Sequence, residues 1–163
     1  MQNQRKNILG ISPGTHTMGL ALIQGKELVE WRMKVFNECW SQVKLGKMLT
    51  AIQDIVVKQC ITDIAVKIMH PARCSEGLHG LNTGIMDIAN SQNITLHSCT
   101  VNDIKAHCSL EKKRNKRVIV EYVLQKHPEL YREYQKEQGI NNSYYIKIFE
   151  AIVIARMFHD NME

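Results

Sequence analysis

The chain has 163 residues, of which 44% are hydrophobic, and it carries a formal net charge of +5 at pH 7. This length suits a single domain spanning residues 1–163, with enough volume for a real core. No apolar run is long enough to cross a bilayer, so we expect no membrane-spanning segment, while the charge permits a polyanionic partner without requiring one.

The first six residues, MQNQRK, lack the hydrophobic region of a secretion signal, which predicts a cytoplasmic protein. The five cysteines favour reduced thiols over a disulfide framework or a zinc knuckle, because their number is odd and no Cys-x-x-Cys spacing occurs. The pairs His97/Cys99 and His107/Cys108 invite a metal interpretation, but both lie in apolar stretches. There we predict packed thiols beside hydrogen-bonded histidines.

Two strands joined by a tight turn are predicted to open the chain. Asn7–Ile11 and Met18–Ile23 are short apolar runs, and Ser12–Thr17 (SPGTHT) between them contains a Pro-Gly pair typical of a turn. Such a hydroxyl-rich turn suits either a phosphate or metal site or an ordinary hairpin. Glu27–Phe36 alternates polar and apolar residues, which predicts a third strand, antiparallel because Gln24–Lys26 is so short.

The middle of the chain changes from strand to helix periodicity and back. Apolar residues at helical spacing from Trp40 predict a long amphipathic helix that ends near Gln59. Asp63–Met69 is β-branched and apolar, which predicts a central strand parallel to the first. His70–Gly84 is predicted to be a loop because it holds a proline and three glycines, and it leads into a helix over Ile85–Ser91.

The last third is predicted to be mostly helical. Asn93–Cys99 is another strand, and Thr100–Asp103 is typical of a cap for a short helix over Ile104–Cys108. A further amphipathic helix follows over Val118–Leu124. Tyr144–Phe158 is an apolar helix that must pack against the sheet. The order of elements predicts an α/β fold, a mixed sheet with helices on both faces.

Positive charge is concentrated in one short segment, residues 111–117. Five cations stand there within seven residues: Lys112, Lys113, Arg114, Lys116 and Arg117. Such a run is typical either of a solvated helix start or of a patch that contacts phosphates, and the sequence leaves both open.

Four stretches resemble the RuvC-like Holliday-junction resolvases of the RNase H superfamily. The family's first hairpin is similar to ILGISPGTHTMGLALI, and its central strand to DIAVKIMH, which is followed by a loop containing LHGLNTGIMDIA. The next strand, short helix and basic helix start resemble LHSCTVNDIKAHCSLEKKRNKRVIVEYVL, and the final helix resembles YIKIFEAIVIARM. The resemblance covers nearly the whole chain apart from residues 128–143. It implies an RNase H-like, RuvC-type mixed sheet.

The resemblance also implies a chemistry and a set of positions for it. Members of the family cut phosphodiesters with acidic side chains that hold Mg²⁺ ions around the scissile phosphate. One acid lies in the first turn, one on the central strand and two on the last helix. This chain has Ser12, Lys67, Lys147 and Glu150 at these positions, so only the last is acidic. A homodimer is also suggested, because resolvases act on paired strands.

Chemistry with two metals needs several carboxylates around the cations. An ammonium at Lys67 or Lys147 would instead repel a cation, by about 4 kcal/mol at 4 Å for an effective dielectric constant of 20. No acid lies within two residues of Lys67, so a register slip does not restore the site. We therefore assign no catalytic residue and no metal, and we expect Glu150 to be the counter-ion of both lysines.

The sequence thus predicts a RuvC-like protein that binds the backbone of nucleic acid, and of DNA in particular, without metal-dependent cleavage. The expected phosphate contacts are Thr15, Lys67, Lys147, Lys112, Lys113, Arg114, Lys116 and Arg117. Ammonium groups would take the electrostatic place of the metals without activating water. Binding of this kind is largely independent of sequence and is weakened by salt.

Two other classes of function stay open. One is an active Mg²⁺-dependent endonuclease with a rearranged site, built from Glu150, Glu76, Asp87 or His70, although a loop histidine that caps a turn is the simpler interpretation of His70. The other is an assembly protein without catalysis. Its partner surface would be formed by Trp31, Met33 or the loop around Leu78 and Leu81.

Overall fold

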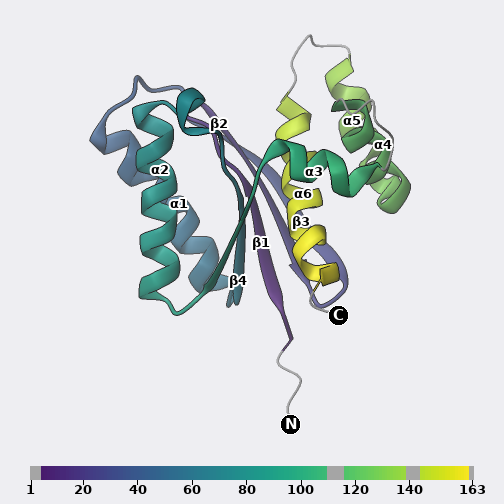
Figure 1. Cartoon of the computed structure of the whole chain (residues 1–163), viewed down its shortest axis with the longest axis horizontal. Helices are drawn as coiled ribbons and strands as arrows, with labels where there is room; N and C mark the ends of the chain where they lie inside the picture. Colours follow the sequence, from purple (N-terminus) through teal and green to yellow (C-terminus); the bar gives the residue numbers. More distant parts are fainter. Residues whose placement is uncertain (1–4, 110–115, 139–143, 162–163) are drawn as a thin grey trace.

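One five-stranded mixed sheet forms the centre of the computed structural model, which describes residues 5–109, 116–138 and 144–161 (Figure 1). The strand order is β3-β2-β1-β4-β5. The strands are β1 (Asn7–Ser12), β2 (Thr17–Gln24), β3 (Glu27–Val35), β4 (Asp63–Lys67) and β5 (Thr95–Cys99). The first three are antiparallel neighbours, and β4 and β5 run parallel to β1. The predicted strands and the parallel pairing of the first with the central strand are confirmed.

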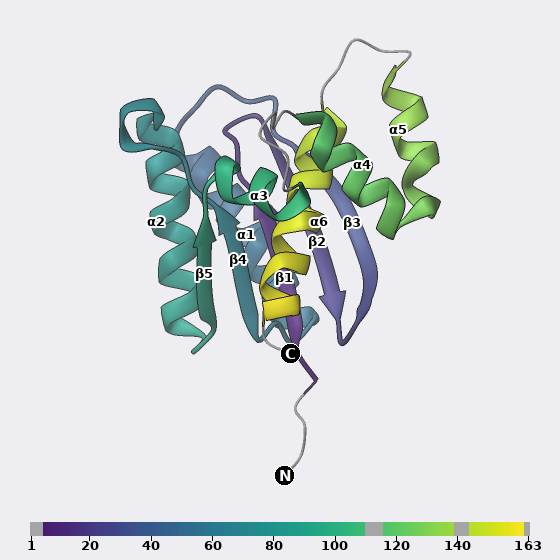
Figure 2. The same ribbon diagram turned by 45° about the vertical axis from the view of Figure 1, so that its right-hand side comes forward.

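Helices cover both faces of this sheet, as predicted. They are α1 (Gln42–Lys58), α2 (Glu76–Ser91), α3 (Val101–Cys108), α4 (Lys116–Lys126), α5 (Tyr131–Gln138) and α6 (Tyr144–Asn161), with 3₁₀ turns η1 (Pro71–Arg73) and η2 (Pro128–Leu130). The helices α1 and α2 lie on one side, and α3 to α6 lie on the other (Figures 1 and 2). No helix within the described ranges is long and apolar enough to span a membrane.

The predicted loop over His70–Gly84 is wrong in its second half. The helix α2 begins at Glu76, capped by the Ser75 hydroxyl, which accepts a hydrogen bond from the Leu78 N–H. Gly84 serves close packing between helices, because a side-chain carbon there would collide with Leu49 of α1. The other predicted boundaries lie within three residues of the observed ones. For example, α3 is predicted from Ile104 and starts at Val101, behind a capping box formed by Thr100 and Asp103.

Alternate residues of the strands feed two separate cores. On β1, Leu9 and Ile11 pack beneath α1 and α2, whereas Ile8 packs beneath α3, α4 and α6. Leu78 and Leu81, proposed above as a partner surface, are buried in the first of these cores. Trp31 and Met33 pack against the second core. The predicted surface around Leu78 and Leu81 is therefore wrong, because both side chains are buried in the core, whereas Trp31 and Met33 are only partly buried and stay a prediction.

The final helix α6 is buried on nearly all sides, because the sheet covers one flank and α3 and α4 cover another. Two glycines let it approach the strands closely. A side-chain carbon on Gly19 of β2 would lie 2.8 Å from the backbone nitrogen of Ile148, and one on Gly10 of β1 would lie 3.0 Å from the Cβ of Ala155. This approach fixes where the polar residues of α6 lie over the sheet.

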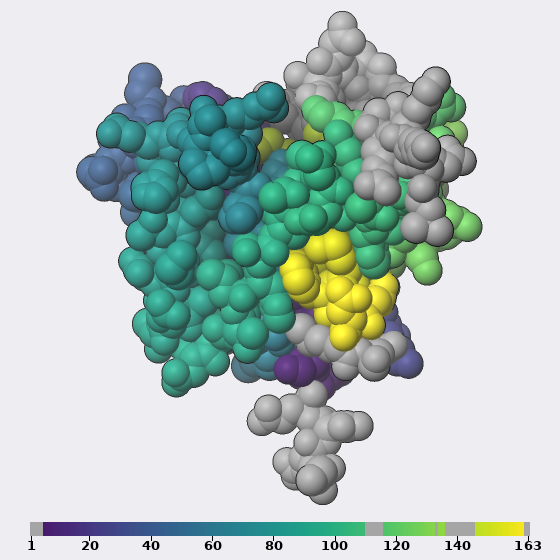
Figure 3. Space-filling model, viewed as in Figure 1, coloured from purple at the N-terminus to yellow at the C-terminus, as the bar shows by residue number. Residues whose placement is uncertain are grey.

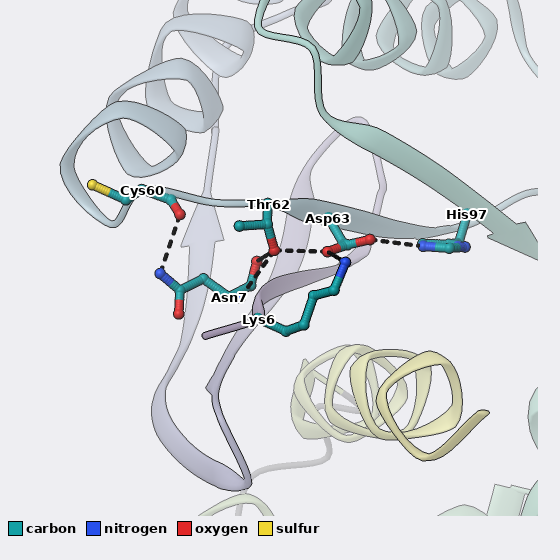
Figure 4. Close-up of polar contacts among 6 residues, drawn as sticks. All are labelled: Lys6, Asn7, Cys60, Thr62, Asp63 and His97. Atoms are coloured by element: carbon teal, nitrogen blue, oxygen red, sulfur yellow. Dashed lines mark hydrogen bonds and ion pairs between the residues drawn. The ribbon is translucent and has the colours of Figure 1, made fainter. Parts of the chain in front are cut away.

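A buried polar cluster joins the strands at the amino end of β4 (Figure 4). The Asp63 carboxylate accepts a 2.6 Å hydrogen bond from the Thr62 hydroxyl and lies 3.1 Å from Nε2 of His97 and 3.7 Å from Nζ of Lys6. Its side chain is only 2% exposed, so these partners must replace its water. The His97 ring in turn stacks on Phe158 of α6, with 4.7 Å between ring centres.

We expect the Asp63→Asn change to lower the free energy of unfolding by about 1–3 kcal/mol, because it removes a buried charged acceptor from three donors. Urea denaturation measures this directly. The matched control is Asp87→Asn on the exposed face of α2, which should change stability by less than about 0.5 kcal/mol. Equal effects of the two changes would contradict a structural role for the cluster.

Candidate functional site

An open cleft of about 920 Å³ lies at the carboxyl ends of β4 and β5, at the opposite end of β4 from Asp63. Part of this hollow is seen near the top of Figure 3, between the teal and green surfaces, with the yellow of α6 inside it. Its lining residues come from six elements and their connections: Thr17, Lys67, Ile68, Met69, His70, Pro71, Arg73, Thr100, Val101, Asn102, Lys116, Ile146, Lys147 and Glu150.

A lysine–glutamate pair lies in the cleft. The ammonium of Lys67, at the end of β4, donates to Oε2 of Glu150 on α6 at 2.7 Å, and the two side chains are 15% and 6% exposed. Ile11 of β1 pairs with Val66 of β4, so the next residues, Ser12 and Lys67, lie side by side. The three positions are therefore together, as the resemblance predicted, and the strand register that places Lys67 there is confirmed.

Lys147 takes a different partner from the one predicted. Its ammonium donates to the carbonyl oxygen of Pro13 at 3.3 Å, and no ion pair with Glu150 forms, so the prediction that Glu150 pairs with both lysines is wrong for Lys147. Burial lowers the pKa of Lys147, and the charges of Lys67 and Lys116 lower it further, against the opposing effect of Glu150.

The remaining cations of the cleft come from outside the strands. Arg73 lies in η1 and Lys116 at the start of α4, both exposed to solvent. The predicted contact Lys116 thus lines the cleft, whereas Arg117 pairs with Glu121 at 3.1 Å along the same helix. The predicted contacts Lys112, Lys113 and Arg114 lie outside the described residues.

The first hairpin contributes to the cleft a residue of β2 rather than the predicted residue of its turn. Thr15 lies beside Gly77 at the start of α2, where its methyl group approaches that glycine, and it is Thr17 that lines the cleft. Arg73, Thr17 and Asn102 were not predicted from the sequence. Arg73 had a usable signal, because it follows a parallel strand at its carboxyl end, where ligands bind in open α/β sheets.

The chain was compared with known proteins by sequence and by structure. No protein-family model matches the sequence, and no curated protein sequence matches it. Among solved structures, Thermus thermophilus RuvC aligns at a TM-score of 0.69 and 14% identity, over 96% of both chains. The fold is RuvC-like. RuvC of the same organism in complex with a Holliday junction substrate aligns at a TM-score of 0.66 and 13% identity, over 96% of both chains. The yeast mitochondrial Holliday junction resolvase Ydc2 aligns at a TM-score of 0.66 and 11% identity, over 97% of this chain and 85% of that one.

The residues present in this RuvC-like fold do not fit a pair of Mg²⁺ ions. Glu150 supplies the one carboxylate among the described lining residues, and the Lys67 ammonium already occupies it. Ser12 is fully buried, and its Oγ has no hydrogen-bond partner among the residues that the structure describes. Hard divalent cations need several anionic oxygens, which this site lacks.

The other candidate metal and catalytic residues have structural environments. His70 accepts a hydrogen bond from the Ala72 N–H through Nδ1, so it caps η1 as the simpler interpretation held. Glu76 and Asp87 lie exposed on α2 and do not line the cleft. No group of three histidine, cysteine, aspartate or glutamate residues within the described ranges is placed to hold a metal.

The two histidine–cysteine pairs are packed, as predicted. His97 contacts Asp63, and Nε2 of His107 lies 3.3 Å from the Tyr122 hydroxyl. Burial raises the pKa of both Cys99 and Cys108 to about 12, which makes these thiols unreactive near neutral pH.

Proposed function

We propose that the cleft binds the phosphate backbone of nucleic acid, DNA in particular, and does not cut it by metal-dependent hydrolysis. The observation that carries this proposal is the charge of the cleft, where four lysine and arginine side chains face a single carboxylate. That carboxylate, on Glu150, is already paired with Lys67. The remaining cations, Arg73, Lys116 and Lys147, are left to attract anions.

The position and shape of the cleft support a nucleic-acid backbone over a small anion. The cleft is open and about 920 Å³ in volume, and its cations come from separated elements, which suits several successive phosphates. The amino end of α3 adds the partial positive charge of a helix start beside Thr100 and Asn102. One solved structure with the same fold is a RuvC bound to a Holliday junction substrate, so branched DNA is the first ligand to test.

The chemistry of the site argues against hydrolysis with metals. The ammonium of Lys67 neutralises Glu150, and the ammonium of Lys147 lies over the turn after β1. These groups attract phosphate as metal ions do, but they bring no bound water whose pKa is lowered enough to attack phosphorus. Binding without hydrolysis follows from that difference.

The test is fluorescence anisotropy with a four-way junction, a duplex and a single strand, with and without Mn²⁺. If three or four phosphates are contacted, affinity for duplex should fall about 40- to 150-fold between 50 and 200 mM salt. Each phosphate contact contributes about −0.9 to the slope of the logarithm of the binding constant against the logarithm of the salt concentration. The Arg73→Gln/Lys116→Gln variant should lower that slope by about 1.8. Its control is Lys58→Gln, an exposed cation at the far end of α1.

Two results would contradict the proposal. An absence of binding at low salt would favour an assembly protein, and nicking that depends on Mn²⁺ would favour the rearranged nuclease.

A further inference from the structure

The segment between β3 and α1, residues 36–41, lies at the same end of the sheet as the cleft. The strand β3 runs in the direction of β1 and β4, because β1, β2 and β3 are successive antiparallel neighbours and β4 is parallel to β1. The N–H of Phe36 donates to the carbonyl oxygen of His16 at 2.7 Å, which joins this segment to the turn after β1. The chain therefore leaves β1, β3 and β4 at one edge of the sheet, where the cleft is.

Trp40 in this segment is connected to the cleft by a short series of contacts. A side-chain carbon on Gly77, in the first turn of α2, would lie 3.0 Å from two ring carbons of Trp40 and 3.1 Å from the methyl group of Thr15. Thr15 follows Gly14, where a side-chain carbon would overlap the amine of Lys147. Trp40 thus packs on the start of α2 beside the same turn that meets a cation of the cleft.

The indole of Trp40 is open to solvent next to positive charge. Trp40 is 37% exposed, whereas Trp31, the other tryptophan of the chain, packs against a core. Arg73 of the cleft lies four residues before Gly77, at the end of η1. Proteins that bind single-stranded nucleic acid combine a cationic groove along the backbone with aromatic rings on which bases stack. The surroundings of Trp40 combine these two features.

Two anchors fix the segment on either side of Trp40. Lys44 of α1 is completely buried, and its ammonium donates to the Glu38 carbonyl oxygen at 2.6 Å. The Ser41 hydroxyl accepts a 3.1 Å hydrogen bond from the Lys44 N–H and caps α1. A buried lysine is costly unless its charge is used, and here it holds the backbone just before Trp40. A ring that is fixed in advance loses little conformational entropy when a ligand binds.

We propose that Trp40 stacks on an unpaired base of the nucleic acid whose phosphates bind in the cleft. The inference rests on the proposed function, because the cations must first hold the backbone beside the ring. The faces of a paired base are covered by its neighbours in a duplex, so the ring favours single-stranded segments and strand ends over continuous duplex. The contact is independent of base identity, since every base has a π face.

The emission of Trp40 tests the contact without altering it, in a Trp31→Phe variant where Trp40 is the one remaining tryptophan. A single-stranded oligonucleotide should quench this emission. A strand of the same length built from tetrahydrofuran abasic units keeps the phosphates but has no bases, so it should bind without quenching.

Substitution of Trp40 gives the size of the effect. The Trp40→Ala change should weaken single-strand binding about 5- to 150-fold, the loss expected when one base–aromatic contact is removed. The Trp40→Phe change should keep most of the affinity, because it keeps an aromatic ring. The matched control is Val43→Ala, an exposed apolar residue of α1 that does not line the cleft. It should bind as the parent does.

A fully paired duplex separates this inference from the proposed function. Trp40→Ala should leave duplex affinity and its salt dependence unchanged, because the phosphate contacts remain. If the parent binds both ligands without quenching, or if Trp40→Ala weakens both equally, the inference is overturned and the proposed function stands. Equal quenching by the abasic strand would also overturn it. Failure of the parent to bind any of these ligands would overturn both.

Discussion

Replacing Gly19 with alanine is expected to lower the free energy of unfolding by about 3 kcal/mol or more, at the upper end of the usual cost of overpacking. The new methyl group would overlap the carbonyl of Lys147 and lie 2.8 Å from the nitrogen of Ile148. Both are backbone atoms of α6, so no side-chain rotation relieves the clash. The helix must move away from β2, and Lys147 and Glu150 must move with it. Salt-dependent DNA binding should therefore weaken together with stability, which urea denaturation and anisotropy measure.

The chain offers a matched control for this change in Gly46. It lies within α1, and a side-chain carbon there would meet nothing within 4 Å. Since alanine is favoured over glycine in a helix interior by about 1 kcal/mol, the Gly46→Ala change should stabilise the protein or leave it unchanged. If Gly19→Ala behaved like Gly46→Ala, α6 could not be packed on β2 as closely as the structure has it.

The strands and the meeting of Lys67 with Glu150 could be predicted because they depend on periodicity and order. A β-branched run that follows a long amphipathic helix returns parallel to the first strand, which brings its carboxyl end to the first turn. What failed was the interpretation of glycine. In α2, Gly84 permits contact with Leu49, but a single sequence gives the same letter for a turn and for a close helix contact.

The partner of Lys147 could not be predicted from helical spacing alone. An i,i+3 pair with Glu150 was available on the same helix, but α6 crosses the sheet so that its residues face different strands. Lys147 lies over Gly19 and the Pro13–Gly14 turn, whereas Glu150 meets the end of β4. Tertiary contacts decide between such partners, because each local pair contributes only about 0.2–0.5 kcal/mol.

Replacing Glu150 with glutamine is expected to destabilise the fold and to strengthen DNA binding. The Glu150 side chain is 6% exposed, and its carboxylate is 2.7 Å from the Lys67 ammonium. Removal of one partner leaves a largely buried charge uncompensated, which costs roughly 3–5 kcal/mol in buried pairs. The matched control is Glu121→Gln, which breaks the exposed pair with Arg117 and should cost less than about 1 kcal/mol.

The gain in affinity has a separate cause. With the carboxylate gone, Lys67 is free to contact phosphate, so the salt slope should steepen by about 0.9, the contribution of one further phosphate contact. A second substitution tests the mechanism, because the Lys67→Met/Glu150→Gln variant removes both charges. It should recover much of the lost stability, since an apolar replacement of a buried pair is often neutral, and it should lose the gain in affinity. A Glu150→Gln variant that unfolds like the parent and binds DNA no more tightly would show that the pair neither supports the fold nor competes with the ligand.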